Sequence, residues 1–358
     1  MHTIPLDAVP VAGAVDREVA PTGIVLRRSP LALRHELDPT LERLVTMPAG
    51  MRLELLTDAH TLELDVMCTV LVVANIQTMA AVFDLVVDGE LRSSVTASEA
   101  TQLVIDPATR AMTAVPGEPA TIRFDDLPGI AGTRVEVWLP HRSVVELRAV
   151  RVDEGASVTP LPRRRRWVHH GSSISHCLEV DHPTDAWPSI TARRADVDLV
   201  NLGVAGSCHL DQHVARTIRD LAVDLVSVKA GINIVEASTM KERAFVPALH
   251  GFLDTVRDGH PDVPIVVSSP IISPRFEDAE SSPDTLTMRR VRELVPEIVA
   301  ARMAAGDAQL HFVDGLALFG ADDVSDLPDG LHPNRAGYAR IGERFHDLAF
   351  DAGRPFAA

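Results

Sequence analysis

The sequence predicts a two-part chain, in which an all-β sandwich precedes an α/β domain built on a parallel sheet. Up to about residue 155, short runs of alternating apolar and polar residues are separated by Asp, Gly, Pro and Thr clusters. This pattern, with no helical segment between the runs, is typical of an antiparallel, jelly-roll-like sandwich. From Trp167 onward, apolar runs alternate with longer amphipathic segments, which favours parallel strands covered by helices on both faces. We therefore expect domains at 1–160 and 161–358, joined by the Pro-containing stretch 154–166.

Each expected element follows from its own local pattern. In the first domain, alternating or β-branched runs predict strands within 51–66, 68–76, 83–95, 120–127, 133–140 and 143–152. In the second domain, short buried runs predict strands at 167–170, 197–203, 224–231, 264–270 and 311–315. The amphipathic segments between and after them predict helices near 185–195, 209–222, 240–258, 284–304 and 334–349.

The composition narrows the classes of function. The 358 residues include 34 Lys plus Arg against 50 Asp plus Glu, a net charge of −16. This balance disfavours nucleic-acid binding, which depends on neutralising phosphates. Three cysteines, none in a CxxC pair, do not suggest a disulfide framework. We find neither a signal-peptide pattern nor an apolar run of the roughly 18 residues that a bilayer requires. We expect a cytoplasmic protein with no nucleic-acid or membrane partner, and the oligomeric state stays open.

Two motifs supply a nucleophile and a base. GSSIS at 171–175 follows a predicted strand, where a glycine permits the tight turn that presents the Ser173 hydroxyl above the sheet. In DGLHPN, Asp329 and His332 lie three residues apart before the last helix. That spacing lets the carboxylate orient the imidazole while the second ring nitrogen accepts a proton. Taken alone, each motif is more often a turn or a helix cap.

Two further motifs suit the stabilisation of an oxyanion. NLGVAGS at 201–207 ends a predicted strand with a glycine-rich turn, whose N–H groups can face a developing negative charge. KAGIN at 229–233 ends the next strand with the amide side chain of Asn233. By themselves they are more often a helix entry and an Asx-turn. Four such features in order, all at the carboxyl edge of one sheet, indicate an active site.

The four blocks resemble those of the SGNH, or GDSL-type, hydrolase family, in the same order and at comparable intervals. The resemblance implies a three-layer, flavodoxin-like α/β domain in which Ser173 is the nucleophile and Asp329 and His332 complete the triad. It also implies an oxyanion hole made by the N–H groups of Ser173 and Gly206 and the side chain of Asn233. Substrate-binding residues stay unassigned, and neither a metal nor a bound cofactor is implied.

Two residues depart from the family pattern, which has aspartate at the positions of Ser172 and Ile234. Neither position performs the attack or the proton transfer, so the chemistry should survive, while loop anchoring and substrate fit are in doubt. His169, His170 and His176 surround the nucleophile, and they either shape the pocket or have structural or surface roles. A thiol nucleophile at Cys177 or Cys208 is disfavoured, because no basic neighbour singles out either one.

The triad does not choose between hydrolysis and transfer, because water exclusion and acceptor binding decide the fate of the acyl group. A sandwich before such a domain resembles carbohydrate O-deacetylases, and also acyltransferases that move an acyl group from a coenzyme A thioester to a natural-product hydroxyl. We expect the transferase, with acyl-coenzyme A as donor substrate and a hydroxylated small molecule as acceptor. An esterase and a non-enzymatic carbohydrate-binding protein are the alternatives. The polar loop 273–283 is either a lid or a surface loop.

Overall fold

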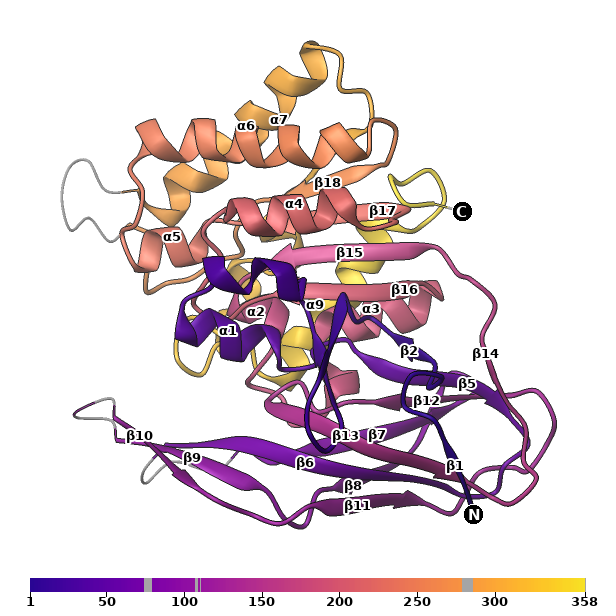
Figure 1. Ribbon diagram of the computed structural model, residues 1–358. Coiled ribbons are helices and arrows are strands. Elements are labelled where there is room, and N and C mark those ends of the chain that lie inside the picture. Colours follow the sequence, from indigo (N-terminus) through magenta and orange to yellow (C-terminus); the bar gives the residue numbers. More distant parts are fainter. Residues whose placement is uncertain (74–78, 107–108, 110, 279–285, 358) are drawn as a thin grey trace. The chain divides into compact units, whose positions relative to one another are not determined.

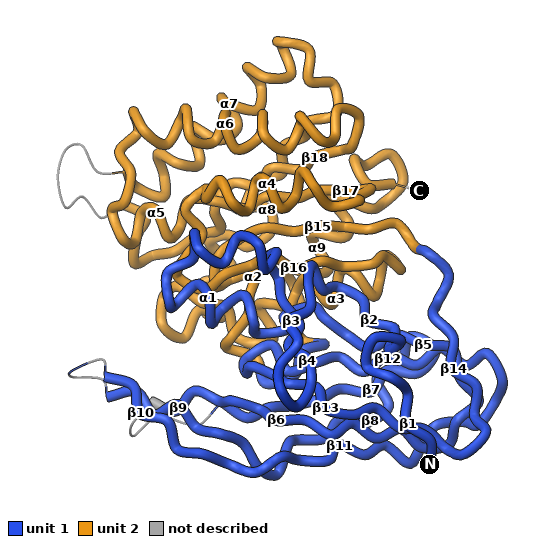
Figure 2. The backbone as a smooth tube through the Cα atoms, in the orientation of Figure 1, with its two compact units in different colours: residues 1–163, 181–184 blue, residues 164–180, 185–358 orange. Residues whose placement is uncertain are grey.

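A computed structural model of the chain describes residues 1–73, 79–106, 109, 111–278 and 286–357. The chain separates into two compact units (Figure 2). Unit 1 consists of 1–163 and 181–184, and unit 2 consists of 164–180 and 185–358. The chain therefore returns briefly to unit 1 soon after it has entered unit 2. The single domain boundary that the sequence predicts near residue 160 does not indicate this return.

Unit 1 is built from two sheets. The strands of the first sheet are β1 (His2–Ile4), β3 (Asp16–Val19), β4 (Ile24–Arg27), β6 (Leu62–Val73), β9 (Thr101–Ile105), β10 (Met112–Val115), β11 (Ala120–Phe124) and β13 (Ser143–Val152). The strands of the second sheet are β2 (Val11–Ala12), β5 (Arg52–Thr57), β7 (Val82–Val87), β8 (Glu90–Thr96), β12 (Thr133–Trp138) and β14 (Val158–Pro160). The first sheet has the order β10-β9-β6-β13-β4-β3, and the second has the order β14-β5-β12-β7-β8.

Side-chain alternation joins the two sheets of unit 1 into a sandwich. In β11, Ala120, Ile122 and Phe124 are buried while the residues between them are exposed, as expected for a strand with one face toward a core. Inward residues of both sheets, such as Leu64 of β6 and Leu85 of β7, belong to one apolar core cluster. The hydrophobic effect across this shared core is the main force that holds the sheets together.

Two details of unit 1 differ from the expected purely antiparallel sandwich without helices. Strand β6 pairs with β9 in parallel. The chain also forms the 3-10 helix η1 (Leu31–Glu36) and the helix α1 (Pro39–Val45). Helix α1 begins where the Asp38 side chain accepts hydrogen bonds from the N–H groups of Thr40 and Leu41, with Pro39 as the first helical residue. This is a strong start signal for a helix, which the strand-based interpretation overlooked.

The stretch 154–166 is not a free linker. Its middle part forms β14, which pairs with β5, and Arg166 is already the first residue of the next strand. Arg164 forms an ion pair with Asp196 at 3.0 Å, and Arg166 forms one with Asp198 at 2.8 Å. The expected strand 68–76 is observed as part of β6, and its last three residues lie outside the described residues.

Unit 2 contains one parallel sheet with helices on both faces (Figure 1). Its strands are β15 (Arg166–Gly171), β16 (Asp198–Gly203), β17 (Leu225–Lys229), β18 (Ile265–Ser268) and β19 (Leu310–Val313), in the order β16-β15-β17-β18-β19. Its helices are α2 (Ser173–His176), η2 (Pro183–Asp185, shared with unit 1), α3 (Trp187–Ala195), α4 (Gln212–Asp220), α5 (Ile232–Glu236), α6 (Glu242–Gly259), α7 (Met288–Ala304), α8 (Gly315–Leu318), η3 (Ala321–Asp326) and α9 (Arg335–Ala349). The expected α/β class with a parallel sheet is confirmed.

The strand order makes β15 the switch point of the sheet. From β15 the chain passes through α3 to β16, and from β16 it crosses back through α4 to β17 on the other side of β15. Right-handed crossovers in opposite directions place α3 and α4 on opposite faces. Helix α9 packs against α3, and α6 packs against α4. Ligands of such sheets bind at the carboxyl ends of the strands beside the switch point, which is where β15 leads into α2.

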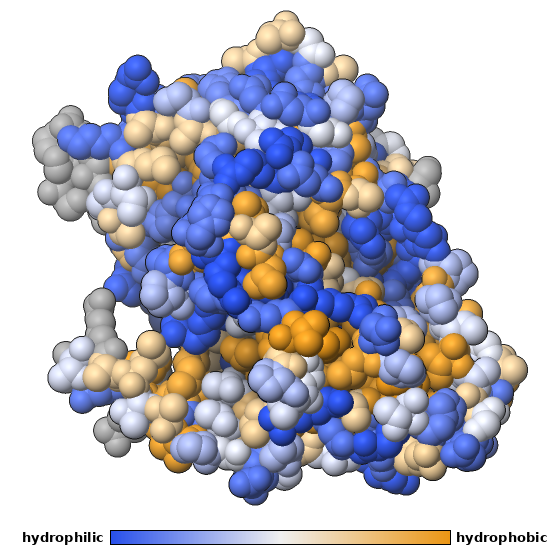
Figure 3. Space-filling view, in the orientation of Figure 1, coloured by the Kyte–Doolittle hydropathy of each residue, from blue (hydrophilic) through white to orange (hydrophobic). Residues whose placement is uncertain are grey.

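Hydrophilic side chains cover much of the visible surface, and strongly hydrophobic ones gather in places in the middle and lower part of the view (Figure 3). Exposed large apolar residues within the described ranges come from separate elements, for example Leu91 of β8, Met303 of α7 and Phe312 of β19. Such isolated residues are normal on protein surfaces. In the part of the chain that the structure describes, no helix combines the length and the apolar character needed to cross a bilayer.

Asp84 holds the returning segment 181–184 in unit 1. Its fully buried carboxylate accepts hydrogen bonds from the Thr184 hydroxyl at 2.7 Å, the Thr184 N–H at 3.2 Å and the Ser94 hydroxyl at 2.6 Å. The Nδ1 atom of His182 lies 2.9 Å from the same carboxylate. Because a buried carboxylate is costly unless its oxygens are satisfied, these partners make residue 84 a structural anchor for the segment that follows the α2 turn.

We predict that Asp84→Ala destabilises the protein by roughly 3 kcal/mol, because it leaves the buried donors of Thr184 without an acceptor. The exposed Asp126 provides a control, since Asp126→Ala should change the free energy of unfolding by less than about 0.5 kcal/mol. Urea unfolding followed by circular dichroism measures both variants. Equal stabilities of the two variants would show that Asp84 does not anchor the segment.

Candidate active site

The turn after β15 presents Ser173 at the start of helix α2. The Ser172 hydroxyl caps this helix by accepting a hydrogen bond from the Ile174 N–H at 3.3 Å. A side chain at position 171 would collide with the Ser175 hydroxyl, so the turn requires glycine there. As the first helical residue, Ser173 has an N–H without an intrahelical acceptor. The hydroxyl of Ser172 therefore performs the capping that the expected aspartate would have performed.

Three side chains predicted from two distant motifs form a continuous hydrogen-bonded chain. The Nε2 atom of His332 lies 2.9 Å from the Ser173 Oγ, and its Nδ1 atom lies 2.7 Å from Oδ2 of Asp329. The other oxygen of Asp329 accepts the N–H groups of His332 at 2.7 Å and Leu331 at 2.9 Å. Ser173 is 7% exposed. The arrangement is that of a nucleophile, a base and a carboxylate that orients the base.

Asp329 stays ionised at ordinary pH. Partial burial opposes its charge, but the hydrogen bonds from the backbone and ring of His332 and from the Leu331 N–H outweigh that effect and lower the pKa of the carboxyl below its usual value. A lowered pKa in the folded state contributes stability above the unfolded value, and this contribution is lost as the pH falls through the folded value. The carboxylate is therefore available to orient His332 across the neutral range.

The two other expected oxyanion donors lie in different settings. Gly206 is exposed, has a φ of 69°, and occupies the turn closed by the hydrogen bond from the Ser207 N–H to the Val204 carbonyl. Asn233 is buried in α5, where its Oδ1 accepts the Cys208 N–H at 3.2 Å. This contact orients the amide, and its Nδ2 donates a hydrogen bond to Oε2 of Glu236 at 3.4 Å, which leaves one of its two N–H groups as a further donor. Among the described residues, no hydrogen bond joins either group to Ser173.

Ile234, the second departure from the family pattern, and the three histidines near Ser173 are all buried in the protein interior. Ile234 is fully buried, where an aspartate would lose its hydration. His169 is buried between the Ser227 and Ser175 hydroxyls, at 2.7 Å from each, and packs against Trp187. Burial lowers the pKa of His169 well below its usual value. His170 and His176 are also fully buried, so the three histidines belong to the interior and not to the surface.

The two cysteines near the strand ends are poor nucleophiles. Burial raises the pKa of the Cys208 thiol to about 12, and burial together with the charge of Glu179 raises the pKa of Cys177 well above its usual value. Both thiols are therefore neutral at physiological pH. Since the thiolate is the reactive form, this electrostatic setting favours Ser173 as the nucleophile.

Glu179 and Tyr338 adjoin the triad, and sequence reasoning missed both. The Tyr338 hydroxyl donates a hydrogen bond of 2.5 Å to Oε2 of Glu179, whose Oε1 lies 3.7 Å from Nε2 of His332. Burial, followed by the charge of Glu179, raises the pKa of Tyr338 well above its usual value. The carboxylate faces the ring nitrogen that would carry the proton of Ser173. Nothing in the spacing of residues 179 and 338 indicates that the fold brings them together.

Lys229 is a second residue whose position only the fold reveals. It ends β17 and is 5% exposed, although lysine side chains are rarely buried. Burial lowers the pKa of its ammonium group from 10.5 to about 8. The sequence motif KAGIN includes this lysine, but the sequence analysis considered only the glycine and the asparagine of the motif.

Two other expectations can be placed in the structure. Residues 279–283 of the loop 273–283 lie outside the described residues, so the structure does not test the lid interpretation.

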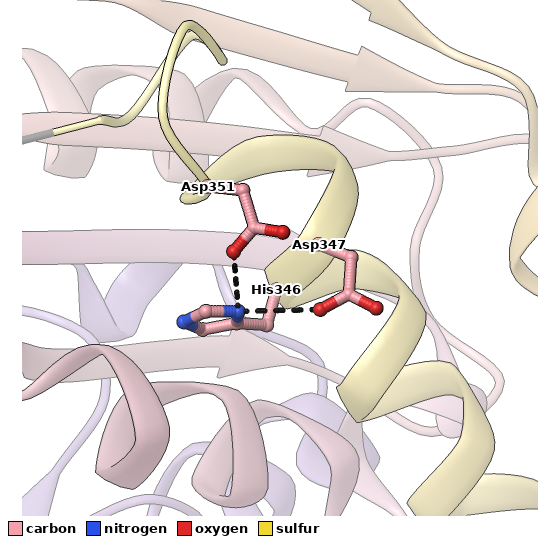
Figure 4. A group of neighbouring side chains, drawn as sticks. All are labelled: His346, Asp347 and Asp351. Atoms are coloured by element: carbon pink, nitrogen blue, oxygen red, sulfur yellow. Dashed lines mark ion pairs between the residues drawn. The ribbon is translucent and has the colours of Figure 1, made fainter.

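Among the described residues, His346, Asp347 and Asp351 form a group whose potential ligand atoms lie within 4.8 Å of one another (Figure 4). They lie at the end of α9 that is remote from His332, roughly 20 Å along the helix. Two of the three are exposed, and we assign no metal to them.

Comparisons with known proteins bear on the family and the fold of the chain. Residues 170–340 match the model of the GDSL-like Lipase/Acylhydrolase family. A comparison with curated protein sequences found no match.

Solved structures resemble the chain over nearly its full length. The salicylyl-acyltransferase SsfX3 from a tetracycline biosynthetic pathway is 28% identical, with a TM-score of 0.81 over 94% of this chain and 92% of that one. A GDSL-like lipase from Bacteroides ovatus is 20% identical, with a TM-score of 0.69 over 96% and 95%. A family two carbohydrate esterase from Clostridium thermocellum is 14% identical, with a TM-score of 0.64 over 95% and 97%. The last two likenesses show the fold alone.

We predict that Asp329→Asn lowers kcat by about 10²–10⁴-fold, because the amide no longer holds His332 in the tautomer that accepts the Ser173 proton. The exposed Asp322 provides a control, and Asp322→Asn should keep kcat within about twofold. Steady-state hydrolysis of 4-nitrophenyl acetate measures both. A similar rate for Asp329→Asn and the wild type would contradict the assigned role of the carboxylate.

Proposed function

We propose that the protein catalyses acyl transfer through an acyl-Ser173 intermediate. The observation that supports this most directly is the hydrogen-bonded chain from Asp329 through His332 to the Ser173 hydroxyl. The match of residues 170–340 to the GDSL-like Lipase/Acylhydrolase family model supports a reaction of the acyl-transfer or esterase class. The alternative of a carbohydrate-binding protein with a degenerate hydrolase domain is disfavoured, because the groups needed for attack and proton transfer are all present in a productive arrangement.

In the proposed first step, His332 takes the proton of Ser173 as Oγ attacks the carbonyl carbon of an ester or thioester. Collapse of the tetrahedral intermediate forms the acyl-serine ester and breaks the bond to the leaving group, which receives the proton from His332. The charged Asp329 stabilises the imidazolium that exists between these events. The carboxylate of Glu179 lies 3.7 Å from the Nε2 atom of His332.

We assign oxyanion stabilisation to the N–H groups of Ser173 and Gly206 and to the side-chain amide of Asn233. The setting of Asn233 supports this assignment, because the Cys208 N–H occupies its oxygen and fixes the orientation of its nitrogen. The positive φ of Gly206 suits a residue that turns its N–H outward. Donors held in advance cost no reorganisation when the charge develops.

For the second step, we propose transfer of the acyl group to a hydroxyl of a small natural product, such as a tetracycline, from a thioester donor such as salicylyl-coenzyme A. The support is the similarity to a salicylyl-acyltransferase, which reaches 28% identity and extends over both units. Acyl-coenzyme A would be a substrate and not a bound cofactor. The alternative is a carboxylesterase or carbohydrate O-deacetylase, in which water accepts the acyl group.

We also propose a cytoplasmic location. The three cysteines are buried and form no disulfide, as is common for proteins of reducing compartments. A coenzyme A thioester would be available in the same compartment.

The proposed reaction predicts that Ser173→Ala reduces turnover at least about a thousandfold, because the mutation removes the nucleophile itself. Wild type and variant would receive 4-nitrophenyl acetate, or acetyl-, benzoyl- and salicylyl-coenzyme A, with and without a polyhydroxylated acceptor. Mass spectrometry would identify free acid, acylated acceptor and the acyl-enzyme. Acceptor-dependent product supports the transferase, and free acid alone supports the esterase.

Ser325→Ala provides a matched control for this experiment, because Ser325 is an exposed serine of the same unit. A fluorophosphonate should label the wild type and Ser325→Ala equally and should not label Ser173→Ala. Turnover or labelling that survives in Ser173→Ala would overturn the proposed mechanism.

A further inference from the structure

The carboxylate of Glu179 lies in the active site, and the proposed mechanism gives it no role. Its Oε1 atom is 3.7 Å from Nε2 of His332, the ring nitrogen that lies 2.9 Å from the Ser173 Oγ. Asp329 already holds the other ring nitrogen at 2.7 Å, so Glu179 is not required to orient the imidazole. A separation of 3.7 Å also exceeds the length of a hydrogen bond. The carboxylate therefore lies beside the reacting nitrogen without taking the place of Ser173.

The protein fixes this carboxylate through one of its two oxygens. Glu179 lies just after α2, in a turn closed by the hydrogen bond from the Val180 N–H to the Cys177 carbonyl at 3.4 Å. Its Oε2 accepts the hydroxyl of Tyr338 from α9 at 2.5 Å. Burial, followed by the charge of Glu179, raises the pKa of Tyr338 well above its usual value, so this hydroxyl stays a donor. Among the described residues, none donates a hydrogen bond to Oε1, and the side chain is 27% exposed. This second oxygen is available to a ligand.

The position of Oε1 suits a hydrogen-bond donor on the incoming substrate. In the second step, the acceptor hydroxyl attacks the acyl carbon and gives its proton to Nε2 of His332, so its oxygen must approach this nitrogen to within about 3 Å. That oxygen then lies close to Oε1 of Glu179 as well. The reacting hydroxyl has one proton, which passes to His332. Because a carboxylate accepts hydrogen bonds but donates none, Oε1 is left for a second hydroxyl on the neighbouring carbon of the acceptor.

We propose that Glu179 binds this second hydroxyl, so that the enzyme selects acceptors with hydroxyls on adjacent carbons. The inference rests on the proposed acyl transfer at Ser173 and names the acceptor class of that site. A hydroxyl that donates to a carboxylate forms a charge-assisted hydrogen bond, which is about twice as strong as one between neutral groups. When the donor is an ester, its leaving alcohol departs in the first step from the place that the acceptor later enters. An ester whose leaving alcohol carries an adjacent hydroxyl therefore gains the same contact.

The test compares two esters, hydroxyethyl benzoate and methoxyethyl benzoate, whose leaving alcohols differ in whether the second oxygen can donate a hydrogen bond. Liquid chromatography of the remaining ester gives kcat/KM for each, whether the acyl group passes to water or to an alcohol. The wild type should prefer the hydroxyethyl ester roughly tenfold. A folding defect or a general loss of activity lowers both values together, so the ratio of the two values isolates the contact.

In Glu179→Gln, the Tyr338 hydroxyl can still donate to the side-chain oxygen, which turns the amide nitrogen toward the substrate. This nitrogen donates equally well to a hydroxyl and to a methoxy oxygen, so the ratio should fall roughly fivefold or more. Glu343 provides the matched control, because it is an exposed glutamate of α9, and Glu343→Gln should keep the wild-type ratio. A wild type without preference for the hydroxyethyl ester, or a ratio that Glu179→Gln does not change, overturns the proposal.

A second variant separates the position of the carboxylate from its charge. Tyr338→Phe keeps the charge of Glu179 but removes the hydrogen bond that fixes it, so its ratio should lie between those of the wild type and Glu179→Gln. A wild-type ratio in Tyr338→Phe contradicts the arrangement proposed for this pair. Failure of the proposed function would appear separately, as turnover of 4-nitrophenyl acetate that survives in Ser173→Ala, because the leaving group of this ester carries no second hydroxyl for Glu179 to bind.

Discussion

The position of β15 at the switch point of the parallel sheet is the constraint on which the active site depends. The strand pairs with β16 on one side and β17 on the other, so its carboxyl end lies between two other strand ends. Ser173 follows the carboxyl end of β15, Gly206 follows that of β16, and Asn233 follows that of β17. His332, from just before α9, completes the site by its hydrogen bond to Ser173. A shift of β15 in register would displace the nucleophile relative to every other group.

Burial determines which of the side chains around the end of β15 are charged. Burial keeps His169, Cys177 and Cys208 neutral, so none of them competes with His332 as a base or with Ser173 as a nucleophile. Asp329 retains its charge because three hydrogen bonds compensate its partial burial. Lys229 is the exception, since no described group compensates it.

The two departures from the family pattern have different consequences. Ser172 retains the capping function at the start of α2 through its hydroxyl, so the nucleophile turn is preserved without a carboxylate. Ile234 contributes a fully buried apolar side chain instead, which removes a potential negative charge from the neighbourhood of α5.

Local sequence determined the class of each unit and the three residues of the proposed triad. Alternating runs distinguished the sandwich from the α/β unit, and the sequence motifs placed Ser173, Asp329 and His332 at strand and helix ends, where the structure joins them. These signals are local because periodicity and turn chemistry act over a few residues. The same local argument missed α1, where a capping signal was overlooked among strands.

Only the tertiary structure decided which distant residues meet. The contacts of Glu179 with Tyr338 and of Asp84 with Thr184 join residues 159 and 100 positions apart, and no periodicity records such pairs. The lack of a partner for Lys229 is likewise a property of its three-dimensional neighbourhood. Burial and desolvation depend on how every element packs, so the pKa shifts of His169, Cys208 and Lys229 arise only when the chain is folded.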